Sequence, residues 1–234
     1  MDSSAAGDTV LVAPGDYQIE SILVADGIAV VGEEGALRTR LHPFPGQLGG
    51  LSCTDLSIPT FISGIWFDGF DSGGDEGVGA INILNCFSVS IRHCVFSKND
   101  YAGISILTQQ EVVVENCTFA DNSHALNVVS GGGWLGHNIF WDPIDGLELS
   151  FVIVCNDVLS IQDVPALLRS ANFSADPLFC ATGDYRIGSG SPCVSGASPL
   201  GGSCQLIGAI PPDCTITPVE TRTWGSIKAL YRRR

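Results

Sequence analysis

The sequence has little charge, and very little of that charge is positive. Only 15% of the 234 residues are Asp, Glu, Lys or Arg, and 25 acidic residues stand against 11 basic ones, so the formal net charge is −14. Between Leu51 and Ser150, Arg92 and Lys98 are the only Lys or Arg residues. A surface of this sign repels polyanions, so the composition argues against nucleic acid as a partner.

Long apolar runs are absent as well. The chain has no stretch of about 18 consecutive apolar residues, so no membrane span is expected. Its first residues also lack the basic stretch and apolar run of a signal peptide. A secreted protein is then expected only if the chain is truncated or trimmed at its N-terminus.

Cysteine spacing of the zinc-binding kind is missing too. None of the nine Cys belongs to a CxxC pair or to a zinc-like cluster with His. Four of them crowd the C-terminal region: Cys180, Cys193, Cys204 and Cys214. That density predicts at least one disulfide and an oxidising compartment, outside the cell or at its surface.

What the sequence has in abundance is glycine and a repeated pattern. There are 28 Gly, and 45% of the residues are hydrophobic, which is typical of an all-β protein with many turns. One motif ends in Phe and recurs at Phe67, Phe96, Phe119 and Phe140. A second begins at Ile81, Ile104, Leu126 and Leu147, with spacings of 23, 22 and 21 residues. A period near 22 is too short for helical-hairpin repeats, and the framework of leucine-rich repeats is absent.

The period predicts stacked coils of three short strands, each strand pairing in parallel with the next coil. Equivalent inward residues should then form three ladders. We expect an aliphatic ladder, a mixed ladder in which Cys94 and Cys117 are small core residues, and an aromatic ladder. Their members are Ile62, Ile91, Val114 and Leu135; Ile65, Cys94, Cys117 and Asn138; and Phe67, Phe96, Phe119 and Phe140.

Three stretches resemble a known family: "AAGDTVLVAPGDY" (5–17), the "GI.I…I..C.F..N" coils, and "DPLFC…GDYRIGSGSPC…IGA". They are similar to right-handed parallel β-helix repeat proteins of the pectin-lyase-like superfamily, of the secreted bacterial type. The resemblance implies a β-helix over residues 1–210, including a C-terminal closing segment. Residues 211–234 would be a tail outside the solenoid. Since little precedes the first coil, that end is expected to be under-capped, as in a truncated chain.

A row of polar residues is the first candidate site. Asn82, Ser105, Asn127 and Glu148 should point outward from successive coils. Beside them we expect a row of small residues, and the two rows together would form a shallow groove for a sugar chain. The small residues are Ala80, Gly103, Ala125 and Gly146. The alternative is that the polar residues simply solvate the sheet.

An acidic rim is the second candidate. The segment between Phe67 and Ile81 is about six residues longer than its counterparts, and insertions in solenoids often mark a binding edge. Carboxylates from this loop and from later coils could hold Ca²⁺ weakly, although the spacing is not that of an EF-hand. The candidate ligands are Asp68, Asp71, Asp75, Asp100 and Asp121. A solvated acidic turn is the alternative.

Catalysis has weaker support. A β-elimination lyase needs a base and a cation, and the related lyases use Arg or Lys with Ca²⁺ held by Asp. Arg92 and Lys98 are the only Lys or Arg in the central coils, and Lys98, near the acidic rim, is the better candidate for the base. The Asp-Asp, Gly-His-Gly and Arg-Ile-Lys signatures of the related polygalacturonases are absent.

The sequence therefore favours a secreted or cell-surface β-helix module, monomeric, that binds a polysaccharide or cell-surface glycan or is structural. The alternative is a polysaccharide lyase or glycoside hydrolase acting on an acidic plant- or algal-type glycan.

Overall fold

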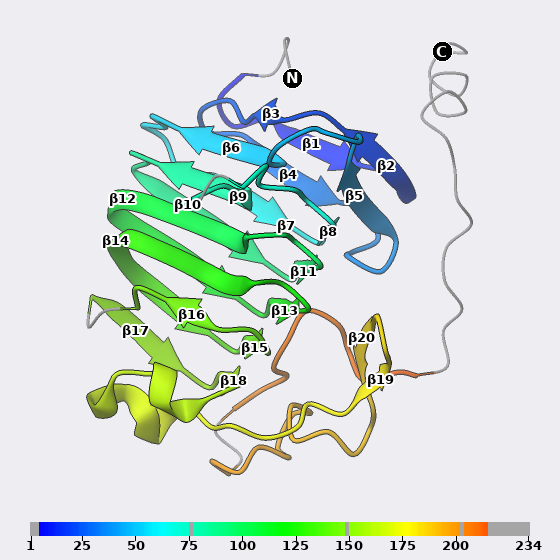
Figure 1. Ribbon diagram of the computed structural model, residues 1–234, viewed down its shortest axis with the longest axis vertical. Coiled ribbons are helices and arrows are strands. Elements are labelled where there is room, and N and C mark those ends of the chain that lie inside the picture. The colour runs from blue at the N-terminus through cyan, green and yellow to red at the C-terminus, as the bar shows by residue number, and fades with distance from the viewer. Residues whose placement is uncertain (1–4, 75–76, 148–149, 202–203, 215–234) are drawn as a thin grey trace.

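The computed structural model describes residues 5–74, 77–147, 150–201 and 204–214. These residues form a stack of coils, each made of three strands that face three sides (Figure 1). All pairings between coils are parallel, as the repeat predicts for a right-handed parallel β-helix. Faces 1 and 3 merge into an 11-stranded sheet because β12 (Ala102–Glu115) and β14 (His124–Gly136) bend around the corner between them.

The remaining strands fall on the three faces in chain order. Face 1 also holds β1 (Thr9–Val12), β4 (Ala29–Gly32), β7 (Thr60–Ser63), β10 (Ser88–Arg92) and β17 (Phe151–Val154). Face 2 holds β2 (Gly15–Ile19), β5 (Thr39–Pro43), β8 (Trp66–Asp68), β11 (Val95–Ser97), β13 (Thr118–Ala120), β15 (Ile139–Phe140) and β18 (Asp157–Val158). Face 3 also holds β3 (Ile22–Leu23), β6 (Leu51–Thr54), β9 (Gly79–Leu84) and β16 (Ile144–Asp145).

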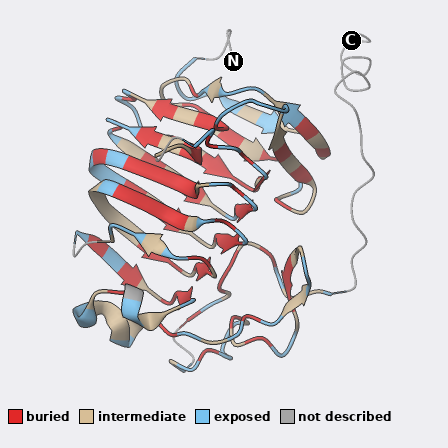
Figure 2. Cartoon of the chain, viewed as in Figure 1, coloured by how far each residue is buried: buried red, intermediate tan, exposed pale blue. Residues whose placement is uncertain are grey.

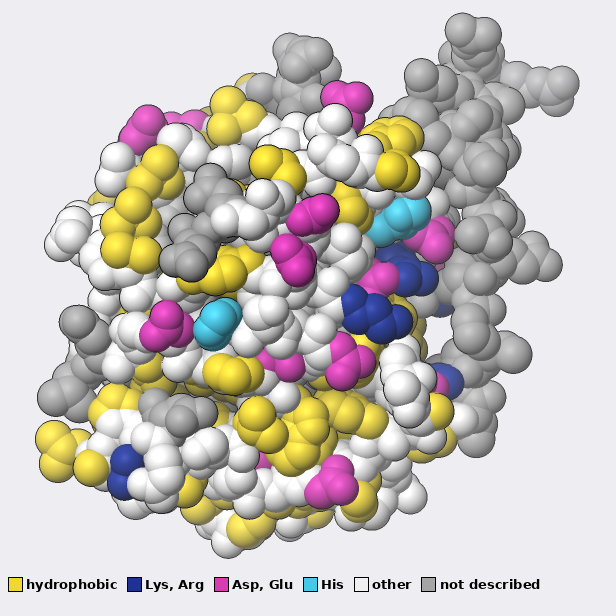
Figure 3. Space-filling model, viewed as in Figure 1, with side chains coloured by type: hydrophobic (Ala, Val, Ile, Leu, Met, Phe, Trp, Pro, Cys, Tyr) yellow, Lys and Arg dark blue, Asp and Glu magenta, His cyan; other side chains and the backbone are white. Residues whose placement is uncertain are grey.

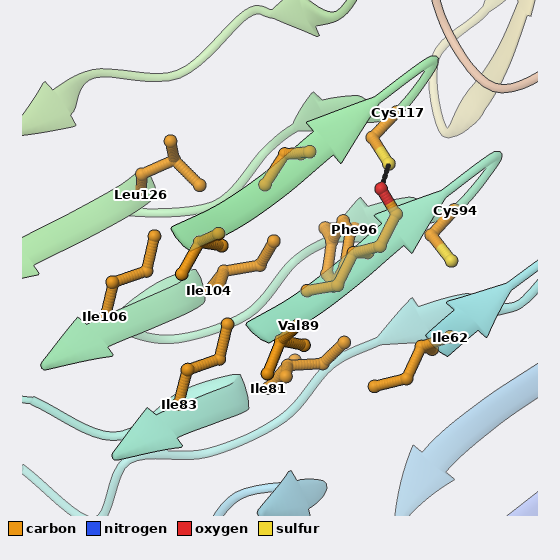
Figure 4. Packing of buried hydrophobic residues seen from close by; sticks show 14 of the residues in the cluster. Ile62, Ile81, Ile83, Val89, Cys94, Phe96, Ile104, Ile106, Cys117 and Leu126 are labelled. Carbon is orange, nitrogen blue, oxygen red and sulfur yellow. Dashed lines mark hydrogen bonds between the residues drawn. The ribbon is translucent and has the colours of Figure 1, made fainter. Parts of the chain in front are cut away.

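The three predicted ladders are confirmed. Strand register aligns Ile62 with Ile91 and then Val114, and it aligns the four ladder Phe in the same way. Neighbouring Phe rings stack with centroids 5.1, 4.7 and 5.0 Å apart. Their spacing follows the rise of the strands, because each ring sits at the same inward position of its coil. The Phe rings are fully buried, and Figure 4 shows Phe96 packed among the aliphatic side chains of both neighbouring faces.

Cys94 and Cys117 are core residues, as predicted. Both thiols are free and fully buried. The Cys117 sulfur lies 3.6 Å from the Ile91 carbonyl oxygen of the preceding coil, the contact drawn in Figure 4. Burial raises the pKa of the Cys117 thiol well above its usual value, so this thiol packs as a small neutral side chain.

Asparagine ladders hold the corners. Asn138 Oδ1 accepts from the backbone N–H of Cys117 at 2.8 Å, and Asn156 and Asn172 repeat this bond one coil further along each time. At another corner Asn122 Oδ1 accepts from the backbone N–H of Asn99 at 3.0 Å. These side chains satisfy backbone groups that turn away from the sheets, which would otherwise be buried without partners.

The last repeat differs from its prediction. Leu126 pairs with Ile144 and Asn127 pairs with Asp145, so Leu147 does not continue the ladder. The corner after Phe140 is shorter than the corresponding corners of earlier coils. Ile144 of β16 therefore takes the ladder position three residues earlier than predicted. Leu147 instead packs half-buried against the edge of the core.

The closing segment contains two 3-10 helices, η1 (Ile161–Asp163) and η2 (Ala166–Ala171), and a hairpin of β19 (Phe179–Ala181) and β20 (Asp184–Ile187). Disulfides join Cys155 to Cys204 and Cys180 to Cys214, which confirms that this region is cross-linked. Residues 211–214 of the predicted tail are thereby attached to the hairpin, and residues 215–234 lie outside the described residues.

The opposite end is open along its strands. Among the described residues, no strand pairs with the outer edges of β1, β2 or β3. The inward-facing Val10 and Val12 of β1 are only half-buried. Within the described part of the chain, no helix is long and apolar enough to span a membrane.

Candidate functional site

The predicted polar row lies on the outer side of face 3. Register places Ser105 directly between Asn82 and Asn127. Ser52 extends the row on one side and Asp145 on the other, in the place predicted for Glu148. Glu148 itself lies outside the described residues. Three of the four predicted residues are therefore neighbours on successive coils.

The hydrogen bonding of the row is uneven. The Asn82 side chain folds back on its own strand, accepting from the backbone N–H of Gly79 at 2.8 Å and donating to its carbonyl at 3.0 Å. The Ser105 hydroxyl is buried and has no hydrogen-bond partner among the described residues. No hydrogen bond joins the Asn127 side chain to the part of the chain that the structure describes, although this residue is only 7% exposed. A buried hydroxyl without a partner costs free energy, and the Ser105 oxygen has almost no accessible surface, so a ligand or water can bond to it only if the side chain turns outward.

The prediction that a row of small residues forms a groove beside this row is wrong for Ala80, Gly103 and Ala125. Ala80 and Ala125 are fully buried in the hydrophobic core. A Cβ on Gly103 would meet the Phe119 ring at 2.8 Å, so this position faces the interior as well. Where each coil turns onto face 3, two consecutive residues point inward. The first of the two lies beside the Phe ladder, where only a small residue fits.

A hollow lies where β12 and β14 bend from face 3 to face 1. Its volume is about 670 Å³, within the range of small-molecule sites. The lining residues come from the two bends and from β17: Gln109, Gln110, Glu111, Val129, Ser130, Gly131, Gly132, Gly133, Trp134, Ser150 and Val152. Figure 1 shows the bend at the left edge, and Figure 2 shows exposed residues on both strands there.

Glycines shape the floor of the hollow. Gly131 and Gly133 have φ angles of 152° and 139°, which disfavour other residues. A Cβ on Gly133 would lie 2.1 Å from the Val112 carbonyl oxygen, so the strands approach too closely for any side chain. The Ser150 hydroxyl donates to the Gly131 carbonyl at 2.6 Å and fixes the turn.

Trp134 forms the aromatic wall of the hollow. Its indole folds over Gly136, where a Cβ would lie only 2.2 Å from the indole nitrogen. The ring therefore rests along its own strand and stays half-exposed. An aromatic ring lying against a sheet is a suitable surface for the apolar side of a sugar ring, while amide and carboxylate groups nearby bind hydroxyls.

The hollow and the polar row are continuous. Ser105, Leu107 and Gln109 follow one another on the outer side of β12, and Asn127 and Val129 do so on β14. Leu107 and Val129 are 43% and 65% exposed. Together these residues make one surface, which we call the bend surface: Ser105, Leu107, Gln109, Gln110, Glu111, Asn127, Val129 and Trp134. The sequence alone did not indicate Trp134, the aromatic residue of this surface. The run Gly131–Gly133 before Trp134 was the feature that could have indicated it.

Two residues of the acidic rim serve the fold. Asp68 is buried on face 2, where it pairs with Arg40 and accepts a hydrogen bond from Ser97. Asp121 accepts a hydrogen bond from the Tyr185 hydroxyl at 2.8 Å and so ties the closing hairpin to the solenoid. Figure 3 shows Lys, Arg, Asp and Glu side chains gathered on the side where β5 lies.

The other rim residues lie on the insertion loop and the next coil. Asp100 accepts from the Ser72 hydroxyl at 3.0 Å, and Asp71 Oδ1 accepts from the Gly73 N–H at 2.7 Å. Asp75 is not among the described residues. Within the described part, no three His, Cys, Asp or Glu side chains converge to hold a metal ion. The structure therefore does not bring the four described candidates to one point.

Lys98 lies at the corner after face 2, with a φ of 55°. Its Nζ reaches the closing hairpin, 3.5 Å from where a Cβ on Gly183 would stand. The residue is exposed, and its assignment as a base stays a prediction. His93 and His137 occupy the left-handed corner between faces 1 and 2, as expected for turn residues.

Comparison with known families agrees with the fold. Residues 62–150 match the family model described as a right handed beta helix region. The match begins at β7 and ends just before β17, so it covers the coils that carry the bend surface. Together with the parallel pairing of the coils, the match supports a right-handed parallel β-helix as the fold. No curated protein and no solved structure gives a significant match.

Proposed function

We propose that this β-helix is a polysaccharide-binding module and that the bend surface is its binding site. The observation that carries the proposal is the hollow lined by Trp134, Gln109 and Gln110. Sugar rings offer an apolar side for the indole and hydroxyls for the amides, so this combination suits a glycan.

The repeating architecture supports a polymeric ligand. Coils present equivalent residues at the spacing of parallel strands, about 4.8 Å. A linear polymer running along the solenoid would meet Asn82, Ser105 and Asn127 in turn. A purely structural role is the alternative, and it would leave the bend surface without a ligand.

A location outside the cell or at its surface belongs to the same proposal. Two disulfides close the C-terminal region, and such bonds persist in oxidising compartments. The parallel coils need no second chain to complete their sheets along the length of the solenoid, which supports a monomer.

The test is a glycan array followed by titration of the best soluble oligosaccharide. Trp134→Ala should weaken binding by more than about tenfold, since aromatic anchors carry most of the energy of such sites. Leu167→Ala is the matched control, because Leu167 is 80% exposed on η2, outside the bend surface. Equal affinity of the two variants, or no glycan bound by the wild type, would reject the proposal.

A further inference from the structure

Charge on the bend surface indicates which glycans it accepts. The strands that form it, β12 and β14, contain no Lys or Arg. On the face that Figure 3 shows, most of the coloured Lys and Arg side chains lie at the right, whereas the bend of the strands is at the left in Figure 1. An acidic sugar chain therefore has no cation here to pair with its carboxylates or sulfates.

Among the described residues that line the hollow, Glu111 carries the one carboxylate. Glu111 is exposed and stands opposite Gly132 of the next coil, which has no side chain to cover it. Its other neighbour in register is Ser88, which is uncharged. Among the described residues, no Lys, Arg or His nitrogen forms an ion pair with Glu111. The carboxylate is thus available to a ligand.

We infer that the hollow selects a glycan that carries protonated amines, an amino-sugar polymer, with the ammonium group at Glu111 and a sugar face on Trp134. The inference rests on the proposed function and names the ligand class of the same site. A carboxylate attracts an ammonium ion through its charge, and an aromatic ring attracts it through its π face. The net charge of −14 adds a long-range field that draws cationic chains and repels polyuronates.

The experiment compares the hexamer of glucosamine, whose amines can be protonated, with the hexamer of N-acetylglucosamine, whose amines are acetylated and uncharged, by calorimetric titration at low ionic strength. The glucosamine hexamer should bind about two- to fivefold more tightly, the range of a single exposed ion pair. The preference should fall as salt is added, because salt screens exposed charges. A galacturonate hexamer should not bind.

Glu111→Gln supplies the decisive variant. It should reduce the ratio of the two affinities, because it weakens binding of the glucosamine hexamer more than binding of the acetylated hexamer. Equal affinities in the wild type, or a ratio that Glu111→Gln does not change, would overturn the inference while the glycan-binding function stands. If neither hexamer binds and the array also finds no glycan, the proposed function fails with it. Glu20→Gln on the first coil is the charge-matched control and should leave the ratio unchanged.

Discussion

The Cys193 thiol donates a hydrogen bond to the Asp157 carboxylate, with 3.2 Å between Sγ and Oδ2. Both side chains are fully buried where the last coil meets the closing segment. Burial raises the pKa of Asp157 to about 7, and the thiol and the Ala175 N–H only partly compensate. Burial likewise raises the pKa of the Cys193 thiol far above its usual value. A carboxyl group that resists ionisation therefore lies at the contact between the last coil and the closing segment.

Stability should depend on pH through this carboxyl group. Because its folded pKa is higher than the unfolded value, its contribution is fully present below about pH 4 and is lost as pH rises through about 7. With an unfolded pKa of 3.8 and a folded pKa of about 7, the contribution of Asp157 is at most about 4 kcal/mol. Asp142, whose pKa burial raises to about 6, acts in the same direction.

Asp157→Asn isolates the effect, because the amide keeps the shape of the side chain and cannot ionise. We expect urea unfolding between pH 4 and pH 8 to show the variant gaining stability relative to the wild type as pH rises. Parallel pH profiles for the two proteins would mean that Asp157 is not the titrating group.

Thiol counting tests the closing segment. The two disulfides leave five cysteines free: Cys53, Cys86, Cys94, Cys117 and Cys193. All five are buried, so a thiol reagent should react slowly with the native protein and should modify five groups after denaturation without a reductant. Nine reactive thiols would show that neither disulfide forms.

Removing one ring of the aromatic ladder should destabilise the solenoid. Phe119→Ala deletes a fully buried ring that stacks on Phe96 and Phe140, and we expect a loss of about 3–5 kcal/mol in the free energy of unfolding. Phe87→Ala is the control, since that side chain is 55% exposed. A loss below about 1 kcal/mol for Phe119→Ala would contradict the register.

The calcium hypothesis now depends on Asp71, Asp100 and Asp75, the last of which lies outside the described residues. If these groups hold the ion, Ca²⁺ should raise the unfolding midpoint of the wild type, because it binds only the native state. Asp71→Ala should abolish the rise, whereas Asp121→Asn should keep it, since Asp121 bonds to Tyr185 instead. A wild-type midpoint that Ca²⁺ leaves unchanged would remove the site.

The repeats made the interior predictable, because Phe67, Phe96, Phe119 and Phe140 occur in clear motifs. Earlier coils continue the same ladder with Tyr17 and Leu41, which the motif search could not detect. The shift from Leu147 to Ile144 arose at a corner, where length varies without disturbing the sheets.

The site was harder to predict than the core. Alternation along a strand gives the outward direction of Ser105 and Asn127, but it does not reveal that β12 and β14 continue unbroken around a corner. The hollow depends on that bend, which places Trp134 beside residues of the preceding coil. Similarly, the partner of Asp68 is Arg40, on a coil without the motif.

Hydrogen exchange with and without a bound oligosaccharide tests the central claim most directly, since it locates the ligand on the intact protein. The bend surface predicts slower exchange over residues 105–111 and 127–134 and unchanged exchange in β2, β5 and the closing hairpin. Protection confined to face 2 or to the closing segment, with none at the bend of β12 and β14, would contradict the account.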